Sequence, residues 1–309
     1  MSVEIERHAP DVSVIVIVYN MAREAPRTLL SLSAAYQRNI DARRYEVIVV
    51  DNGSTPPFDL HALEKLDGNF RLIRIDDAKP SPAQAINRGL AEARGKLIGV
   101  MIDGARIASP GVIALAAKAQ RLAERTVILT LGFHLGPQVQ MKSVLEDYDQ
   151  KQEDRLLEDS GWTEDGYRLF DISVFAGSSA NGWFEPISES NAVFMCKALW
   201  DELGGFDERF RAPGGGLVNL DTLSRAVRLR DVDVVTLLGE GTFHQIHGGV
   251  ATNSTTSPWD LFHAEYKEIR GHAFQSPAYR SLYLGRVPVN ALDSIRRSAQ
   301  RTPAVELPK

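Results

Sequence analysis

The chain has 309 residues, 44% of them hydrophobic and 24% charged, a composition typical of a globular protein with one large α/β domain or two small ones. Its formal net charge of -5 argues against the broad basic surface of a nucleic-acid-binding protein, so we expect no nucleic-acid partner. The one cysteine, Cys196, cannot form an internal disulfide, and the first residues carry no apolar signal core. We therefore expect a cytoplasmic protein, with peripheral contact to the inner face of a membrane left open.

Apolar segments rich in β-branched residues alternate with segments of helical periodicity over the first hundred residues. The expected strands cover residues 12–19, 45–50, 70–75 and 97–102, and the expected helices cover residues 25–36, 60–66 and 83–94. This alternation predicts an α/β fold with a doubly wound, mostly parallel sheet flanked by helices.

The pattern becomes less regular after residue 105. The charged run 139–158 is expected to be a solvated helix, and the segment 161–184 to be irregular and rich in aromatic residues. The other expected elements are helix 110–124, strand 127–132, strand 189–195, helix 197–203, helix 222–229 with Asp221 at its N-cap, strand 232–238 and helix 259–270.

Three of the early strands end in polar residues, at Tyr19-Asn20, at Asp51-Asn52 and at Asp103. The carboxyl ends of parallel strands share one edge of a sheet, where ligands of such folds bind. The sequence lacks the GxGxxG and GxxxxGK[ST] phosphate loops, so a bound diphosphate would need a metal ion or side chains to neutralise it. Asp103, followed by Gly104, is a candidate ligand for a hard cation or a sugar hydroxyl, and the alternative is a turn whose aspartate caps the next helix. The order of the elements on either side favours the ligand role.

Several segments in order resemble the family 2 glycosyltransferases of the GT-A fold. They are VSVIVIVYN at 12–20, YEVIVVDNGS at 45–54, AINRGLAEARG at 85–95, IDGA at 102–105, SNAVFMCKALWDELGGFDE at 190–208 and NLD at 219–221. The resemblance implies a UDP-, GDP- or dTDP-linked sugar donor, a divalent cation (Mn²⁺ or Mg²⁺) and inversion at the anomeric carbon. The donor-binding residues that it suggests are Ile17, Val18, Tyr19, Asn20, Asp51, Asn87, Ile102, Asp103, Gly104 and Arg106.

The chain departs from the family's Asp-x-Asp motif, because Ala105 stands where the second aspartate is usual. The expected metal ligands are therefore Asp103 and His244, the latter at a position where many relatives supply an imidazole. His247 lies three residues further on, and turn stabilisation is the alternative role for both histidines.

A second departure affects the general base. Asn219 stands where relatives often carry the catalytic aspartate, and an amide cannot accept the proton of an attacking hydroxyl. Asp221, the nearest carboxylate, and Glu189, at the end of a buried segment, are the two candidate bases. Asn219 and Trp183 are the candidate contacts to the acceptor, Trp183 as a platform for the apolar face of a sugar.

The resemblance divides the chain into a GT-A domain at 1–254 and a helical C-terminal extension at 255–309 with a partly disordered tail. Within the domain, residues 12–105 would bind the nucleotide and residues 106–254 the acceptor, a glycan or a lipid-linked molecule. A homo-oligomer is left open.

Two further hypotheses compete with an active glycosyltransferase. Ala105 and Asn219 favour a catalytically impaired nucleotide-sugar-binding or scaffold protein of the same fold. The retained polar set Asp51, Asp103, Asp221, Glu240 and His244, expected at one edge of the sheet, argues against it. A nucleotidyltransferase would need a glycine-rich basic loop after the first strand, which residues 20–24 do not form.

Overall fold

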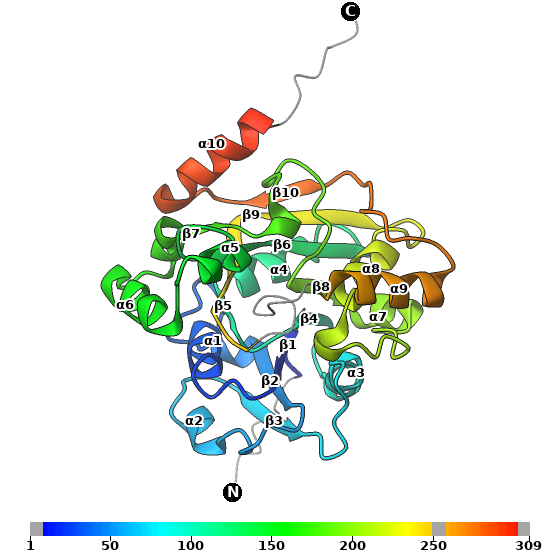
Figure 1. Cartoon of the computed structure of the whole chain (residues 1–309), viewed down its shortest axis with the longest axis horizontal. Helices are drawn as coiled ribbons and strands as arrows, with labels where there is room; N and C mark the ends of the chain where they lie inside the picture. The colour runs from blue at the N-terminus through cyan, green and yellow to red at the C-terminus, as the bar shows by residue number, and fades with distance from the viewer. Residues whose placement is uncertain (1–8, 249–257, 302–309) are drawn as a thin grey trace, which may run out of the picture.

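The computed structural model describes residues 9–248 and 258–301, and one mixed sheet runs through this part of the chain (Figure 1). The main path of this ten-stranded sheet has the order β10-β9-β6-β8-β4-β1-β2-β3, with β5 paired to β9 and β7 paired to β6. No helix of the described residues is both long enough and apolar enough to cross a membrane.

The N-terminal half of the sheet is parallel. Strand β1 (Val12–Val18) lies between β2 (Tyr45–Asp51) and β4 (Leu97–Met101), and β3 (Phe70–Arg74) pairs with the far side of β2. All residues of β1, β2 and β4 are buried, as expected of strands covered on both faces. The parallel strands predicted from the sequence are confirmed.

Helices cover both faces of this half, as a doubly wound sheet requires. Helix α3 (Ala83–Glu92) packs on one face, where Ile86 belongs to the same apolar cluster as Ile15. On the other face lie α1 (Ala25–Ser31) and α2 (Leu60–Glu64), whose Leu29 and Leu63 belong to a second cluster together with Val14. Figure 1 shows α1 and α3 on opposite sides of β1.

The C-terminal half of the sheet is mixed. Strand β8 (Ala192–Cys196) runs antiparallel to both β4 and β6 (Thr126–Leu135), whereas β9 (Asp233–His244) is parallel to β6. The short strands β5 (Arg106–Ala108) and β7 (Ser173–Phe175) are antiparallel to the ends of β9 and β6. Because β5 follows β4 after only a turn, the end of β4 lies beside the end of β9.

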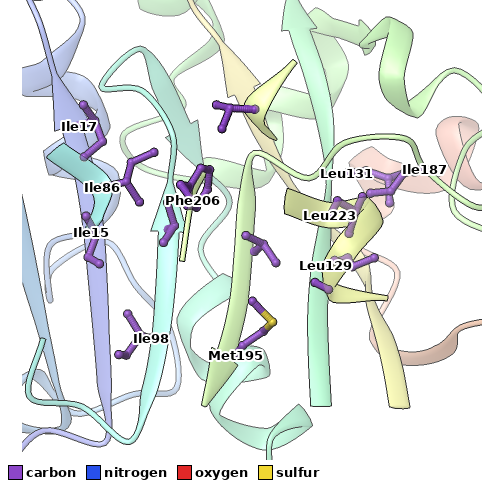
Figure 2. Packing of buried hydrophobic residues seen from close by; sticks show 14 of the residues in the cluster. Ile15, Ile17, Ile86, Ile98, Leu129, Leu131, Ile187, Met195, Phe206 and Leu223 are labelled. Atoms are coloured by element: carbon purple, nitrogen blue, oxygen red, sulfur yellow. The ribbon is translucent and has the colours of Figure 1, made fainter. Parts of the chain in front are cut away.

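One apolar cluster connects the two halves. Figure 2 shows it running from Ile15 and Ile86, past Met195 on β8, to Leu129 on β6 and Leu223 on α8. The remaining helices are α4 (Val112–Ala119), α5 (Gln140–Leu145), α6 (Gln150–Ser160), α7 (Lys197–Leu203), α8 (Val218–Ala226), α9 (Trp259–Arg270) and α10 (Leu292–Arg301).

Three sequence predictions about the second half need correction. The run 139–158 forms two helices, because Asp147 adopts a positive φ of 64° and Asp149 caps a new helix. It is also not fully solvated, since Glu153 is buried. Helix α8 starts at Val218 after the left-handed glycines 214–216, so Asp221 lies inside the helix and is not its N-cap.

The C-terminal extension contains α9 as predicted, and also a strand. β10 (Leu282–Gly285) pairs in parallel with β9 and forms one edge of the sheet (Figure 1). The residues after 301, which we expect to be partly disordered, lie outside the described residues.

Candidate active site

The turn after β4 places Asp103 beside the end of β9. The Asp103 carboxylate accepts a bond from Ala105 N at 3.0 Å and one from Arg106 Nε at 2.8 Å. A Cβ on Gly104 would lie 3.0 Å from Val18 Cγ2 and 3.2 Å from Ile17 O, so a larger residue would fit tightly here and glycine lets the turn pack closely on β1. Arg106 then pairs with His244 across the β5–β9 ladder.

This turn brings together three side chains of types that could ligate a metal ion. One ligand atom from each of Asp103, His244 and His247 lies within 4.8 Å of the others. The two histidine Nε2 atoms are 3.0 Å apart and form a hydrogen bond with each other. Two nitrogens bound at right angles to one metal at about 2.1 Å would be separated by about 3.0 Å, so the spacing fits adjacent positions on a single cation. A carboxylate with two imidazoles is a donor set typical of divalent transition metals.

Burial keeps the imidazoles in the form that a metal binds. Desolvation, with a further contribution from the Arg106 charge, lowers the pKa of His244 well below its usual value. Burial also lowers the pKa of His247, although Asp103 opposes this shift. Both rings are therefore neutral at pH 7, and neutral imidazole is the metal-binding form.

His134 on β6 is a neighbour of this cluster that the sequence did not reveal. It pairs with His244 in the β6–β9 ladder, and the two ring centroids are 5.5 Å apart. Burial, with a contribution from Arg106, lowers the pKa of His134 to about 4. Its Nδ1 accepts a bond from Gln140 N at 2.8 Å, so the proton of the neutral ring is on Nε2. His134 is thus a fixed neutral hydrogen-bond donor.

The missing second aspartate of the motif has a structural explanation. Ala105 is fully buried and belongs to the apolar cluster that contains Val18 and Met21. A carboxylate at this position would lose its hydration without gaining a partner, at a cost of several kcal/mol. His244 and His247 are the side chains near Asp103 that could serve as ligands in place of a carboxylate at position 105.

A polar network connects the cluster to one of the two candidate bases. Glu189 Oε1 accepts a bond from Asn219 Nδ2 at 2.7 Å. With the Asn191 amide oriented to satisfy both neighbours, its nitrogen donates to Glu189 Oε1 at 3.3 Å and its oxygen accepts from Arg106 Nη1 at 3.1 Å. Since Arg106 also donates to Asp103, the network runs without a break from Glu189 to the metal-ligating side chains.

The other candidate base is held in ion pairs. Asp221 is 1% exposed, and Arg270 Nε donates to its Oδ1 at 2.6 Å. Its Oδ2 accepts from Arg270 Nη2 at 2.6 Å and from Arg225 Nε at 2.8 Å. Both oxygens are therefore occupied by guanidinium groups, and the Arg270 guanidinium joins α9 to α8.

Two of the five expected donor-binding residues near β1 and β2, Asn20 and Asp51, have side chains that bond to the protein itself. Asn20 Oδ1 accepts from Thr55 N at 2.8 Å, which links the loops after these two strands. Asp51 accepts from Ser54 N, Phe58 N and Arg74 Nη1 at 2.7–3.0 Å. The Asp51 carboxylate therefore shapes its own loop.

The remaining expected donor contacts differ in their accessibility. The side chains of Ile17 and Val18 are buried in the core, Ile102 is partly buried, and Tyr19 is 55% exposed. Asn87 bonds to both Phe206 N and Phe206 O at 2.9 Å. It also lines a cavity of about 470 Å³ between the end of β3 and α3 that does not contain the metal-ligating cluster.

Two other residues singled out in the sequence lie inside the protein. Trp183 is 1% exposed, packs against Phe133, and donates to Leu237 O at 3.0 Å, so its ring offers no platform to a sugar. Glu240 is 2% exposed and accepts bonds from Tyr167, Ser109 and Gly111. It stabilises the start of α4 rather than facing the strand ends.

Helix α6 fixes the backbone between the two histidine ligands. Glu153 Oε2 accepts from Ile246 N at 2.8 Å, and its Oε1 accepts from Arg23 Nη2 at 3.1 Å. Arg23 also donates to Ile246 O at 3.0 Å and to Asp154 at 2.6 Å. The loop after β1 and helix α6 thus hold the segment that presents His247.

Comparison with known proteins bears on the class of this chain. The model of glycosyl transferase family 2 matches residues 13–156, slightly less than half of the chain, and the predicted resemblance to this family is confirmed. No curated protein matches the sequence.

Crystal structures of TarS from S. aureus show a similar fold. TarS 1-349 aligns at 17% identity with a TM-score of 0.53, covering 83% of this chain and 65% of that one. The same fragment in complex with UDP-GlcNAc aligns at 19% identity with a TM-score of 0.52, covering 83% and 66%. A longer TarS structure aligns at 17% identity with a TM-score of 0.52, covering 86% of this chain and 41% of that one. The chain therefore spans less than two thirds of each TarS structure, and the likeness shows a GT-A fold.

Proposed function

We propose that this protein transfers a sugar from a nucleoside-diphosphate sugar to a hydroxyl of a glycan or lipid-linked acceptor, with inversion and with a divalent cation. The observation that carries the proposal is the cluster of Asp103, His244 and His247 at the carboxyl end of β4, connected through Arg106 and Asn191 to Glu189. The bound UDP-GlcNAc of the TarS fragment supports a nucleotide-sugar donor.

Asp103, His244 and His247 would hold the cation. When bound, the cation would offset the charge that develops on the departing diphosphate. Two imidazole nitrogens beside one carboxylate favour Mn²⁺ over Mg²⁺, which prefers oxygen ligands. His134, with its proton on Nε2, is positioned as a neutral donor to a phosphate oxygen.

Glu189 is the proposed general base. Its carboxylate would take the proton of the acceptor hydroxyl while that oxygen attacks the anomeric carbon and the bond from this carbon to the diphosphate breaks. Attack from the face opposite the leaving group inverts the configuration. Asn219 donates to Glu189 and orients it, so an amide at this position is compatible with catalysis. Asp221 is bound by two arginines, and we propose a structural role for it.

A catalytically impaired donor-binding protein is the second candidate, favoured by Ala105 and Asn219. Both candidates bind a nucleotide sugar, and only the enzyme requires Glu189. Their difference is therefore turnover and not donor affinity.

Thermal unfolding with UDP-, GDP- and dTDP-sugars tests the proposal. We expect one class of donor to raise the unfolding temperature in Mn²⁺ and not in EDTA, because a ligand at 100 times its Kd stabilises the folded state by about 2.7 kcal/mol. His244→Ala and His247→Ala should each weaken Mn²⁺ binding by about 10- to 100-fold or more, as measured by titration calorimetry.

The matched control is His61→Ala, whose side chain is 77% exposed and which should bind Mn²⁺ as the wild type does. Stabilisation by a donor to the same extent in EDTA would exclude the metal. Absence of stabilisation by every donor would exclude the function.

A further inference from the structure

A second cavity lies in the C-terminal half, away from the cluster of metal-ligating residues. It has a volume of about 320 Å³ and lies between residues 184–186, which precede β8, and residues 279–283, which lead into the edge strand β10. Its wall contains the aromatic residues Phe184, Tyr279 and Tyr283 and the polar residues Glu185, Arg280 and Ser281. We call it the aromatic cleft.

Hydrogen bonds and ring contacts hold the wall of the aromatic cleft in place. The Tyr279 hydroxyl accepts from Ile187 N at 2.9 Å and donates to Ile187 O at 3.1 Å. The rings of Phe184 and Tyr283 meet edge to face, with centroids 5.5 Å apart. Ser281 Oγ lies 2.8 Å from Thr236 Oγ1 on β9. The cleft is therefore formed before any ligand binds.

The chemistry of the wall selects the class of ligand. Within residues 9–248 and 258–301, neither Glu185 nor Arg280 forms an ion pair, although both border the cavity. Glu185 is partly exposed and Arg280 is exposed, and an acyl chain would form no hydrogen bonds with either charged group. A sugar ring presents C–H groups that pack on aromatic faces, and hydroxyls that bond to a carboxylate, a guanidinium and a serine. We propose that the aromatic cleft binds one sugar unit of a carbohydrate.

The position of the cleft relates it to the transfer reaction. Glu185 precedes Glu189 by four residues, and a chain of that length spans at most about 14 Å. The Tyr279–Ile187 bonds fix the middle of this segment. A glycan of a few units could therefore reach from the cleft to the proposed base. The assignment of this carbohydrate as the acceptor rests on the proposed function, whereas sugar binding in the cleft does not.

Saturation-transfer NMR with methyl glycosides of glucose, galactose, mannose and N-acetylglucosamine tests the binding. We expect at least one of these probes to bind the wild type through its ring protons. Tyr283→Ser should weaken that binding by about 3- to 10-fold, the usual value of one aromatic contact. Tyr283 is 41% exposed, so the variant should fold.

Leu282→Ser is the matched control. Leu282 lies on the same strand and is 52% exposed, but side chains alternate along a strand, and Ser281 and Tyr283 are the residues that face the cavity. This variant should bind the probes as the wild type does. Binding of no probe, or equal binding by the Tyr283→Ser variant, would overturn the proposal.

Failure of this proposal can be distinguished from failure of the proposed function. Stabilisation by a nucleotide sugar in Mn²⁺ should be the same in the Tyr283→Ser variant and the wild type. A protein that binds the donor and none of the glycosides has a donor site and no sugar site in the cleft. A protein that binds a glycoside through Tyr283 and no donor has the cleft without the proposed transfer activity.

Discussion

The loops after β1 and β2 and the corner between β4 and β9 contain similar polar residues, but the structure uses them differently. In the loops, Asn20 and Asp51 accept bonds from backbone N–H groups of residues 54–58. At the corner, Asp103, His244 and His247 bring their side-chain ligand atoms together. Asp103 also accepts a bond from the backbone of its own turn, at Ala105 N, but only at the corner do neutral imidazoles lie beside the carboxylate in an arrangement that could hold a metal ion. Burial and polarity alone do not separate these two kinds of residue.

The largest effect on activity should come from substitution of Glu189, which we group with the candidate site residues at the corner between β4 and β9. Glu189→Gln keeps the shape and the contact to Asn219 but removes the group that accepts the proton. Turnover should fall by about 10²- to 10⁴-fold, while the stabilisation by donor in Mn²⁺ stays unchanged. Steady-state rates of nucleoside diphosphate release measure the first effect, and thermal unfolding measures the second.

The control for this prediction is Glu164→Gln, whose side chain is 74% exposed and which should retain the wild-type rate. A Glu189→Gln variant with full turnover would show that the base lies elsewhere. If the Glu189→Gln variant loses both turnover and thermal stability, the role of Glu189 is structural, like that of Asn20 and Asp51.

The parallel half of the fold could be predicted because its information is local. The strands 12–19, 45–50 and 97–102 are mostly apolar and rich in β-branched residues, and such runs are typical of strands buried on both faces. The break between α5 and α6 was missed, because it depends on Asp147 in a left-handed conformation, which a helical charge pattern does not reveal. The strand β10 was missed because its residues are half exposed and only its pairing with β9 defines it.

The site could be predicted only in part, for a related reason. Asp103 stands at a strand end and is visible in the sequence. His134 and Asn191 belong to the site only because β6 pairs with β9 and β8 lies between β6 and β4, which no local pattern encodes. The one signal for His134 in the sequence is its position as a polar residue near the end of the apolar run 126–135. One of the two arginine partners of Asp221 is Arg270, 49 residues away, and this ion pair could not be inferred from the sequence.

The second prediction concerns Asp221, for which we propose a structural role. Asp221→Asn removes the charge that Arg225 and Arg270 surround, and breaking a buried ion pair costs about 3 kcal/mol. The free energy of unfolding, measured in urea at pH 7, should fall by about that amount, and turnover per folded molecule should be unchanged. Asp231→Asn, at a carboxylate that is 77% exposed, should change stability by less than about 0.5 kcal/mol. Unchanged stability with lost turnover would instead make Asp221 the base.

The smallest effect concerns Glu153. Like the loop-shaping residues, it bonds to a backbone N–H group, but this group belongs to Ile246, which lies between the two histidines of the cluster. Burial raises the pKa of Glu153 to about 7, so the folded protein binds a proton at pH 5 that the unfolded chain has mostly released. Stability from this group therefore decreases as the pH rises from 5 to 7. The Glu153→Gln variant lacks this titration.

We compare the free energy of unfolding of the wild type with that of the Glu153→Gln variant at each pH. The wild-type value minus the variant value should decrease by about 2 kcal/mol between pH 5 and pH 7. Urea unfolding at pH 5, 6 and 7 measures this difference, and Glu158→Gln, at an exposed position on the same helix, should show no pH-dependent difference. A difference that increases with pH would mean that the Arg23 ion pair outweighs burial. The segment that presents His247 would then be held more firmly at pH 7 than at pH 5.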